Sequence, residues 1–283
     1  MSWRIGISSG ACVDAPILDI LHDLRGSGAC GIEVGTPPRH FDPLQEDQTR
    51  ALAARLAADQ LQAVSIHAPF GAALDLADPN PHHRHAAVGA ALTSGDAIRR
   101  LNGTVVVVHP SDLVRQRHHD VSARLTDCLA SLRVLAHHFR SSGVTLAVES
   151  PLPHLIGGHP DEFAWLLDHL DPDVRVCLDT GHLALGRQWD RFVALAGRRL
   201  VHVHANDNHG HRDDHLPPGD GQIDWAAIAA SLHAASFDGW IMLELRCPTG
   251  DRAAYFTRAY EQAQRLLAVA PPVSASTTRG HSL

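Results

Sequence analysis

The sequence has few cysteines, and the five it has are scattered along the chain with no CxxC pair. An odd, scattered set argues against a disulfide framework and against a cysteine-ligated zinc site, and it is typical of a reducing compartment. No apolar stretch reaches the roughly 20 residues that a membrane-spanning helix needs. The opening MSWRIGISSG enters a strand-like run with no targeting signal. We therefore expect a cytoplasmic protein with no membrane partner.

Basic clusters and nucleotide-binding loops are also missing. The 24 Lys plus Arg are outnumbered by 31 Asp plus Glu, and no basic block indicates a nucleic-acid surface. No GxxxxGKS loop occurs and no GxGxxG opens a helix after a strand, so we expect no nucleotide cofactor. GISSG at 6–10 fits the GxSxG nucleophile pattern by letter only, because it lies in the first strand of the chain.

Length and patterning favour one large α/β domain. The chain has 283 residues, 45% of them hydrophobic, which is a normal size for a barrel of eight strands and eight helices. Short apolar runs alternate with segments of helical periodicity, which is typical of parallel strands joined by crossover helices. We predict strands at 4–8, 31–34, 63–66, 104–108, 145–149, 174–179, 200–205 and 240–245. We predict helices at 14–26, 45–60, 84–101, 120–141, 160–169, 188–197, 224–235 and 252–268.

Eight strand-helix units favour a closed (β/α)8 TIM barrel over an open doubly wound sheet, although periodicity alone leaves both open. We predict a single catalytic barrel over residues 1–269 and a disordered tail over 270–283. Capping residues for the helices are predicted at Asp14 with Pro16, at Asp161 with Glu162, and at Asp224.

Histidines and carboxylates recur where the predicted strands end. In a (β/α)8 barrel, catalytic groups collect at the carboxyl ends of the strands. A lone histidine in such a place is more often a satisfied polar residue than a metal ligand. A series at six successive strand ends is harder to dismiss, because imidazole and carboxylate are the ligands of zinc and manganese sites. The candidates are His67, His109, Glu149, Asp179, His182, His204, Asp213, His215 and Glu244.

Glu244 carries its own argument, because it stands between Leu243 and Leu245 in an apolar run. An unpaired carboxylate inside a buried strand is costly, so we expect it to face a cation or hydrogen-bond donors. Strand alternation predicts that it points into the barrel together with Met242 and Arg246.

With these residues the chain resembles the xylose-isomerase-like barrel superfamily, which includes apurinic endonuclease IV and the sugar phosphate isomerases and epimerases. The resemblance covers nearly the whole chain and implies two alternative sites. The endonuclease IV pattern implies three metals. The first would be held by His67, His109 and Glu149; the second by Glu149, Asp179, His204 and Glu244; the third by His182, Asp213 and His215.

The epimerase branch implies a single metal held by Glu149, Asp179, His204 and Glu244, with the two glutamates acting as acid and base. Three divalent cations against four carboxylates leave a net charge of +2, whereas one cation against three carboxylates leaves −1. A positive cluster suits a phosphate ester attacked by metal-bound hydroxide, and the mononuclear site suits proton transfer beside a carbonyl. The additional ligands favour phosphoester hydrolysis, with isomerisation or epimerisation as the alternative. A non-catalytic sugar- or metal-binding barrel is a third interpretation.

The substrate is expected to be a small anionic or sugar molecule, contacted by Phe70, Asn206 and Arg246. Abasic DNA is possible but not favoured, since the loop SPLPHLIGGHP after Glu149 departs from the endonuclease pattern. Candidates for DNA contact are Phe70 and the run Arg39, His40 and Phe41. Zinc is the expected metal, in up to three copies, with manganese or iron as alternatives. The oligomeric state is left open.

Overall fold

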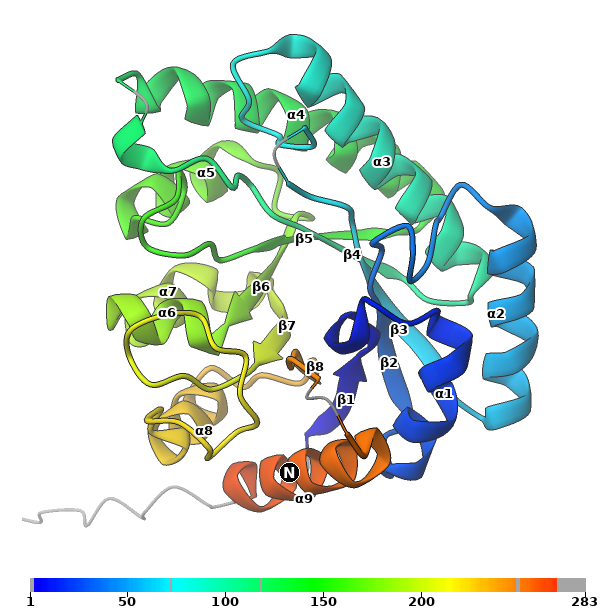
Figure 1. The fold of residues 1–283 in the computed structure, drawn as a ribbon. Helices are drawn as coiled ribbons and strands as arrows, with labels where there is room; N and C mark the ends of the chain where they lie inside the picture. Colours follow the sequence, from blue (N-terminus) through cyan, green and yellow to red (C-terminus); the bar gives the residue numbers. More distant parts are fainter. Residues whose placement is uncertain (1–2, 72, 118, 248–249, 269–283) are drawn as a thin grey trace, which may run out of the picture.

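The computed structural model describes residues 3–71, 73–117, 119–247 and 250–268, and the tail predicted for 270–283 lies outside these ranges. Eight parallel strands close into one barrel in sequence order, with β8 paired to β1 (Figure 1). The prediction of a (β/α)8 barrel is confirmed, and the open doubly wound alternative is wrong. The strands are β1 (Arg4–Ser8), β2 (Gly31–Val34), β3 (Gln62–His67), β4 (Val105–Val108), β5 (Thr145–Glu149), β6 (Arg175–Asp179), β7 (Leu200–Ala205) and β8 (Trp240–Leu243).

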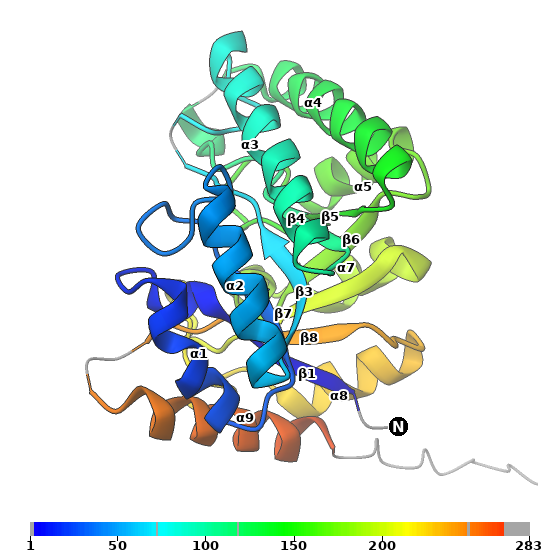
Figure 2. The same cartoon turned by 90° about the vertical axis from the view of Figure 1, so that its right-hand side faces the viewer.

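The helices form a ring outside the strands, and Figure 2 shows α1, α2 and α9 side by side on one flank. They are α1 (Ile17–Gly26), α2 (Glu46–Asp59), α3 (Pro81–Arg100), α4 (Val121–Ser142), α5 (Pro160–His169), α6 (Thr180–Gly186), α7 (Trp189–Ala196), α8 (Trp225–Ala234) and α9 (Arg252–Leu267). Short 3-10 turns lie at Ser9–Cys12, Arg115–Arg117 and Gly197–Arg199. No helix within the described ranges is long and apolar enough to span a membrane.

The helix starts match the predicted caps only in part. Asp224 accepts a hydrogen bond from the Ala227 backbone N–H and caps α8 as predicted. The cap predicted at Asp14 is wrong, because α1 begins at Ile17 after Pro16 and has no side-chain cap. Helix α6 was not predicted, since seven residues are too few to show a periodicity.

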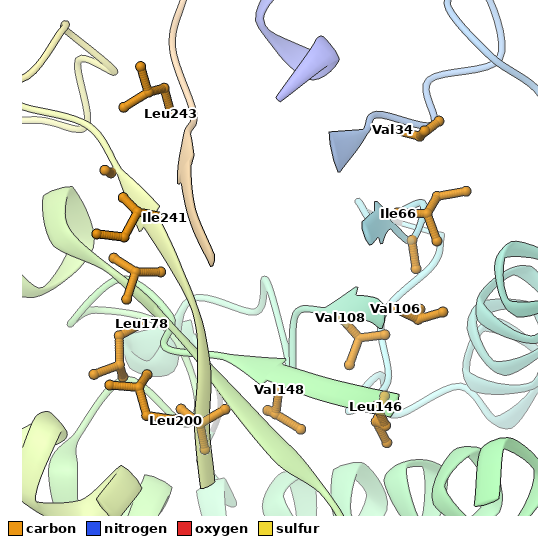
Figure 3. Packing of buried hydrophobic residues seen from close by; sticks show 14 of the residues in the cluster. Val34, Ile66, Val106, Val108, Leu146, Val148, Leu178, Leu200, Ile241 and Leu243 are labelled. Atoms are coloured by element: carbon orange, nitrogen blue, oxygen red, sulfur yellow. The ribbon is translucent and has the colours of Figure 1, made fainter. Parts of the chain in front are cut away.

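Alternate residues of the strands face the helices and form the main core. Figure 3 shows apolar side chains of seven strands pointing away from the barrel axis toward the surrounding helices. The labelled residues are Val34, Ile66, Val106, Val108, Leu146, Val148, Leu178, Leu200, Ile241 and Leu243. The period of two then sends the intervening residues inward, which is how the barrel collects polar side chains at its centre.

Two glycines make room for large side chains at the amino-terminal end of the barrel interior. A Cβ on Gly6 would lie 2.6 Å from the Met242 sulfur, and one on Gly31 would lie 2.4 Å from the Trp240 ring. Met242 and Trp240 therefore occupy space that the glycines leave free. The barrel interior is packed at this end, and the cavities open at its carboxyl end.

Candidate metal centre

The carboxyl ends of the strands bring the nine predicted ligands into one cluster. His67, Glu149 and Asp179 are the last residues of β3, β5 and β6. His204 lies in β7. Of the other five, His109 follows β4, His182 follows β6, Asp213 and His215 follow β7, and Glu244 follows β8. Strand β8 ends at Leu243, so Glu244 lies one residue beyond the strand in which it was predicted. Its backbone N–H still donates to the Ala205 carbonyl at 3.2 Å, which keeps its carboxylate turned into the barrel.

Glu149 is the hub of this cluster. One carboxylate oxygen, Oε2, lies 3.0 Å from His67 Nε2 and 3.2 Å from His109 Nε2. The other oxygen, Oε1, lies 3.1 Å from His204 Nδ1. The side chain is only 1% exposed, so it depends on these partners for its charge. Glu149 can therefore bridge two neighbouring groups of ligands.

The ligand atoms of Glu149, Asp179, His204 and Glu244 all lie within 4.8 Å of one another. Three carboxylates and one imidazole are a donor set that suits a divalent cation. Asp179 is fully buried, and burial together with Glu244, Asp213 and Glu149 raises its pKa to about 6 against the opposing effect of His182. Carboxylates this close repel one another when both are ionised. A divalent cation between them would remove this repulsion, so the group suits a metal site.

A second set of three ligands, His182, Asp213 and His215, borders this group. His182 Nε2 lies 3.5 Å from Asp213 Oδ2, and His215 Nε2 lies 2.8 Å from the same oxygen. Asp213 Oδ1 is buried and has no hydrogen-bond partner among the described residues. His215 adopts φ +50°, a conformation that costs energy for a residue other than glycine. An unsatisfied oxygen and a strained histidine are consistent with a binding role.

The loop that carries Asp213 and His215 is fastened by Asp207. This fully buried carboxylate accepts hydrogen bonds from Trp225 Nε1 and from the Gly219 and Ile223 backbone N–H groups at 2.8–3.1 Å. Its backbone also pairs with Leu216. The loop after β7 is thus held to the start of α8 independently of the ligands that it presents.

The third set contains His67, His109 and Glu149. His109 Nδ1 lies 2.8 Å from Asp112 Oδ1, so a carboxylate supports the ring from behind. Asp75 accepts the Asp112 backbone N–H at 2.6 Å and fixes the loop. The sequence analysis missed Asp112, in HPSD at 109–112, and Asp75, in LDLAD at 74–78, because neither segment distinguishes them from ordinary loop aspartates.

The remaining predicted site residues differ in position. Phe70 is 54% exposed and stands over the cluster, with its ring 4.2 Å from that of His109. Asn206 is fully buried, and its amide donates to Asp179 Oδ2 at 2.7 Å. The Arg246 side chain is exposed and forms no ion pair within the described ranges. We therefore expect Phe70 to contact a substrate and Asn206 to orient Asp179.

Two of the DNA-contact candidates are wrong. His40 and Phe41 are 2% and 0% exposed, because His40 Nδ1 bonds to the Ala15 carbonyl at 2.5 Å and the Phe41 ring belongs to the core. A nucleic acid cannot reach them without unfolding the loop. Arg39 is exposed, but it has no companion basic residue in this run.

Two cavities open onto the cluster. One, of about 340 Å³, lies over β1–β3 and is lined mainly by apolar residues and by His67 and Glu244. Another, of about 200 Å³, lies over β4–β7 and is lined by Glu149 and by the second ligand set, His182, Asp213 and His215. Phe70 and Glu244 border both cavities. Among the residues that the structure describes, no arginine lines either of them, and the sequence contains no lysine.

His182 and His215 carry protons that a cation must displace. Burial opposes the charged imidazole, but the neighbouring carboxylates raise the pKa of His182 to about 9 and that of His215 to about 10. A metal binds only the neutral imidazole, so its binding releases these protons. We expect Zn²⁺ affinity to rise as the pH rises from 6 to 8.

Calorimetric titration of Zn²⁺ in buffers of different ionisation enthalpy measures the protons released. Release should fall in a His182→Gln, His215→Gln double variant. Equal heats in all buffers would contradict the expectation.

Comparison with known proteins places this architecture. A family model described as the xylose isomerase-like TIM barrel matches residues 21–268. An uncharacterized protein of Methanocaldococcus jannaschii is 27% identical over 188 residues, 64% of each chain. The inosose dehydratase of Lacticaseibacillus casei is 27% identical over 135 residues, 40% of each chain. The matched part of this chain spans between 43% and 64% of the length of the first three curated relatives.

Solved structures match over almost the whole chain. A D-tagatose 3-epimerase-like protein has a TM-score of 0.81 at 21% identity and covers 93% of this chain and 98% of its own. The L-ribulose 3-epimerase has a TM-score of 0.78 at 21% identity, covering 94% of both chains. The 3-keto-D-glucoside 4-epimerase from E. coli has a TM-score of 0.76 at 18% identity, covering 93% and 99%. These likenesses show the shared fold, and with the family match they establish that the chain belongs to the xylose isomerase-like TIM barrel family.

Proposed function

We propose that this protein is a divalent-metal-dependent enzyme that transfers a proton at a carbon beside the carbonyl of a sugar, as in isomerisation or epimerisation. The observation that carries the proposal is the convergence of Glu149 and Glu244 on the same atom, His204 Nδ1, at 3.1 and 3.2 Å. With Asp179 they form the four-ligand group. A bound divalent cation would polarise the sugar carbonyl and acidify the neighbouring C–H bond.

The two glutamates are carboxylates that border the cavities and can act as acid and base. Burial works against the charge of Glu244, but His204 and His215 lower its pKa to about 2, so it is an ionised base at neutral pH. Its side chain is 21% exposed and faces both cavities, which gives it access to a substrate. Glu149 borders the second cavity. One carboxylate takes the proton from carbon, and for epimerisation the other returns a proton to the opposite face.

The chemistry of the walls favours a neutral sugar over a sugar phosphate. The chain has no lysine, so a Schiff base that would activate the carbonyl covalently is not available to it. The cavities also lack an arginine to hold a phosphate group. The apolar wall over β1–β3, which includes Phe70, can cover the C–H face of a sugar and exclude water from the reacting carbon.

The relatives' names support this choice. Matched proteins are described as 3-epimerases, a 4-epimerase and an inosose dehydratase, and all three activities are directed at sugars or a related polyol ketone. They favour the isomerase and epimerase alternative over the trinuclear hydrolase that the additional ligands suggested from sequence. Phosphoester hydrolysis remains a second candidate, on the observation that His182, Asp213 and His215 converge beside the four-ligand group.

Solvent exchange tests the main proposal directly. The purified protein, loaded with Zn²⁺ or Mn²⁺ in D₂O, is incubated with D-tagatose, D-fructose, D-allulose, L-ribulose and an inosose. We expect deuterium to enter the carbon next to the carbonyl of at least one of these compounds, as measured by NMR, because the glutamates exchange the abstracted proton with solvent. The Glu244→Gln variant should show no incorporation.

The second candidate predicts a different pattern. Release of inorganic phosphate from sugar phosphates, with no deuterium incorporation in any ketose, would overturn the proton-transfer proposal. Metal content then separates the two sites. Under the proton-transfer proposal, an Asp213→Ala, His215→Ala double variant should keep the metal of the four-ligand group. If the protein is a trinuclear hydrolase, the same variant should lose one of three metals together with its activity.

A further inference from the structure

Beneath the four-ligand group, the barrel interior contains a carboxylate that the proposed reaction does not use. Glu33 is 0% exposed and points inward from β2, between Ile32 and Val34. Its strand-register neighbours are Ser8 in β1 and Ser65 in β3. Both hydroxyls donate to it, Ser8 to Oε1 at 3.2 Å and Ser65 to Oε2 at 2.8 Å. A buried charge is held in place only by such donors, so the site is specifically built for a carboxylate.

Two histidines of β7 complete the set of donors. His202 Nε2 lies 3.2 Å from Glu33 Oε2, and His204 Nε2 lies 3.2 Å from both carboxylate oxygens. On the other side of the barrel, β4–β6 present only Val107, Ala147 and Cys177 at this level, and these are small and apolar. The polar contacts of Glu33 are therefore confined to the serines and the two histidines among the described residues.

His204 faces in two directions at once. Its Nε2 is directed at Glu33, and its Nδ1 is directed at Glu149 and Glu244. A neutral imidazole has one N–H donor and one lone pair, and the hydrogen bond made by one nitrogen decides the role of the other. Because the oxygens of Glu33 can only accept a hydrogen bond, they keep the proton on Nε2. Nδ1 faces carboxylates as well, so it is the nitrogen whose proton a cation in the four-ligand group would replace.

We propose that Glu33 is a positioning residue that holds the His204 ring in the Nε2–H tautomer, so that Nδ1 is presented to a divalent cation. A carboxylate behind a metal-binding histidine fixes the ring and increases its basicity, and loss of such a partner typically lowers metal affinity 10- to 100-fold. His202 has a different role. Its polar contacts are with Glu33 and Ser65, and it meets the four ligands only through edge-on packing of its ring against that of His204, so among the described residues it holds Glu33 in place. The proposal rests on the metal centre of the proposed function and not on the reaction carried out there.

Metal affinity provides the test. Zn²⁺ binding is measured by competition with a chromophoric chelator in the wild-type protein and in Glu33→Gln, which keeps the volume of the side chain and removes its charge. We expect the stoichiometry to stay the same and the dissociation constant to rise 10- to 100-fold. The matched control is Ser65→Ala, which removes a donor to Glu33 but leaves the contact with His204, and which should change the constant by about threefold or less.

Each other outcome has a defined meaning. Equal affinity in the wild type and Glu33→Gln would overturn the proposal. Loss of one whole equivalent of Zn²⁺ with unchanged affinity for the rest would also overturn it, because Glu33 would then be a ligand of a separate site with His202 and His204. If Zn²⁺ does not bind the wild type at all, the metal centre itself is refuted, and with it the proposed function.

A measurement on the wild-type protein covers the case in which Glu33→Gln does not fold. Long-range ¹H–¹⁵N spectra of protein labelled with ¹⁵N-histidine distinguish the two tautomers, and a His204→Gln sample assigns the signal. We expect Nε2 to carry a proton both without and with metal, and the Nδ1 signal to change when Zn²⁺ is added. Loss of the Nε2 proton on addition of Zn²⁺, with Nδ1 still protonated, would refute the role of Glu33.

Discussion

A Glu149→Gln variant is expected to lose at least about 10³-fold in kcat, since it removes both an acid-base group and a metal ligand. The amide keeps the shape of the side chain but cannot neutralise a cation. It also leaves His67, His109 and His204 around a neutral group in place of the carboxylate that they contact at 3.0–3.2 Å. Steady-state rates on whichever sugar shows solvent exchange, together with metal per chain from elemental analysis, measure the effect.

The matched control is Glu162→Gln. Glu162 is 8% exposed and also accepts charged and backbone donors, Arg115 at 2.9 Å and the Gly157 N–H at 2.9 Å, but it lies in α5 away from the cluster. We expect its kcat and metal content to stay near those of the wild type. A Glu149→Gln enzyme within tenfold of wild-type kcat would show that this carboxylate is neither base nor essential ligand.

Removing the metal should produce the largest change in stability. Glu149, Asp179 and Glu244 are confined with their ligand atoms within 4.8 Å, and without a cation their charges repel one another in a buried site. A ligand present at about 1,000 times its dissociation constant stabilises the folded state by about 4 kcal/mol. With an unfolding entropy of about 2.1 cal/mol/K per residue, that corresponds for a domain of this size to a fall in Tm of roughly 7 °C on chelation.

Scanning calorimetry of the Zn²⁺-loaded protein, with and without EDTA, checks this value. The shift should shrink strongly in Glu149→Gln, which starts with fewer charges to neutralise and binds the metal less well. If the Tm of the wild type is the same with and without EDTA, the four-ligand group does not need a bound cation for the stability of the fold, and the prediction is wrong.

Local patterns were enough to predict the barrel and most of its polar centre. In β5 and β6 an apolar residue that faces the helices, Val148 or Leu178, is followed by a carboxylate, Glu149 or Asp179, at the last strand position. This change from apolar to charged located the carboxyl ends of the strands within a residue or two. The number of units favoured closure, which the pairing of β8 with β1 confirms. The strand around Glu244 ends earlier than predicted, because apolar letters continue past the last ladder contact at Leu243.

Glu33 shows where the reading of the sequence was incomplete. It stands between Ile32 and Val34 just as Glu244 stands between two leucines, and the same burial argument applies to both. It was missed because it lies one level below the strand ends, where no catalytic group was sought. Its partners come from three other strands, and contacts between residues as distant as Glu33 and His204 cannot be read from spacing.

The choice between reactions could not be made from ligand letters alone. The nine residues satisfy the three-metal pattern, and four of them satisfy the one-metal pattern. Only the walls of the site distinguish a neutral sugar from a phosphate ester as the substrate class. The absence of arginine from both cavities and the apolar wall near Phe70 depend on how loops after β1, β2 and β3 pack together. That packing is a tertiary property.

The fastening of the loop after β7 bears on how the side chains that it carries can be exchanged. Asp207 secures the segment to α8 by its own hydrogen bonds, so Asp213 and His215 are carried on a unit that does not depend on the centre it borders. Substitution of Asp213 and His215 would leave these hydrogen bonds of Asp207 in place. The loop is thus a separately anchored support, on which these two side chains can be exchanged without removing its attachment to α8.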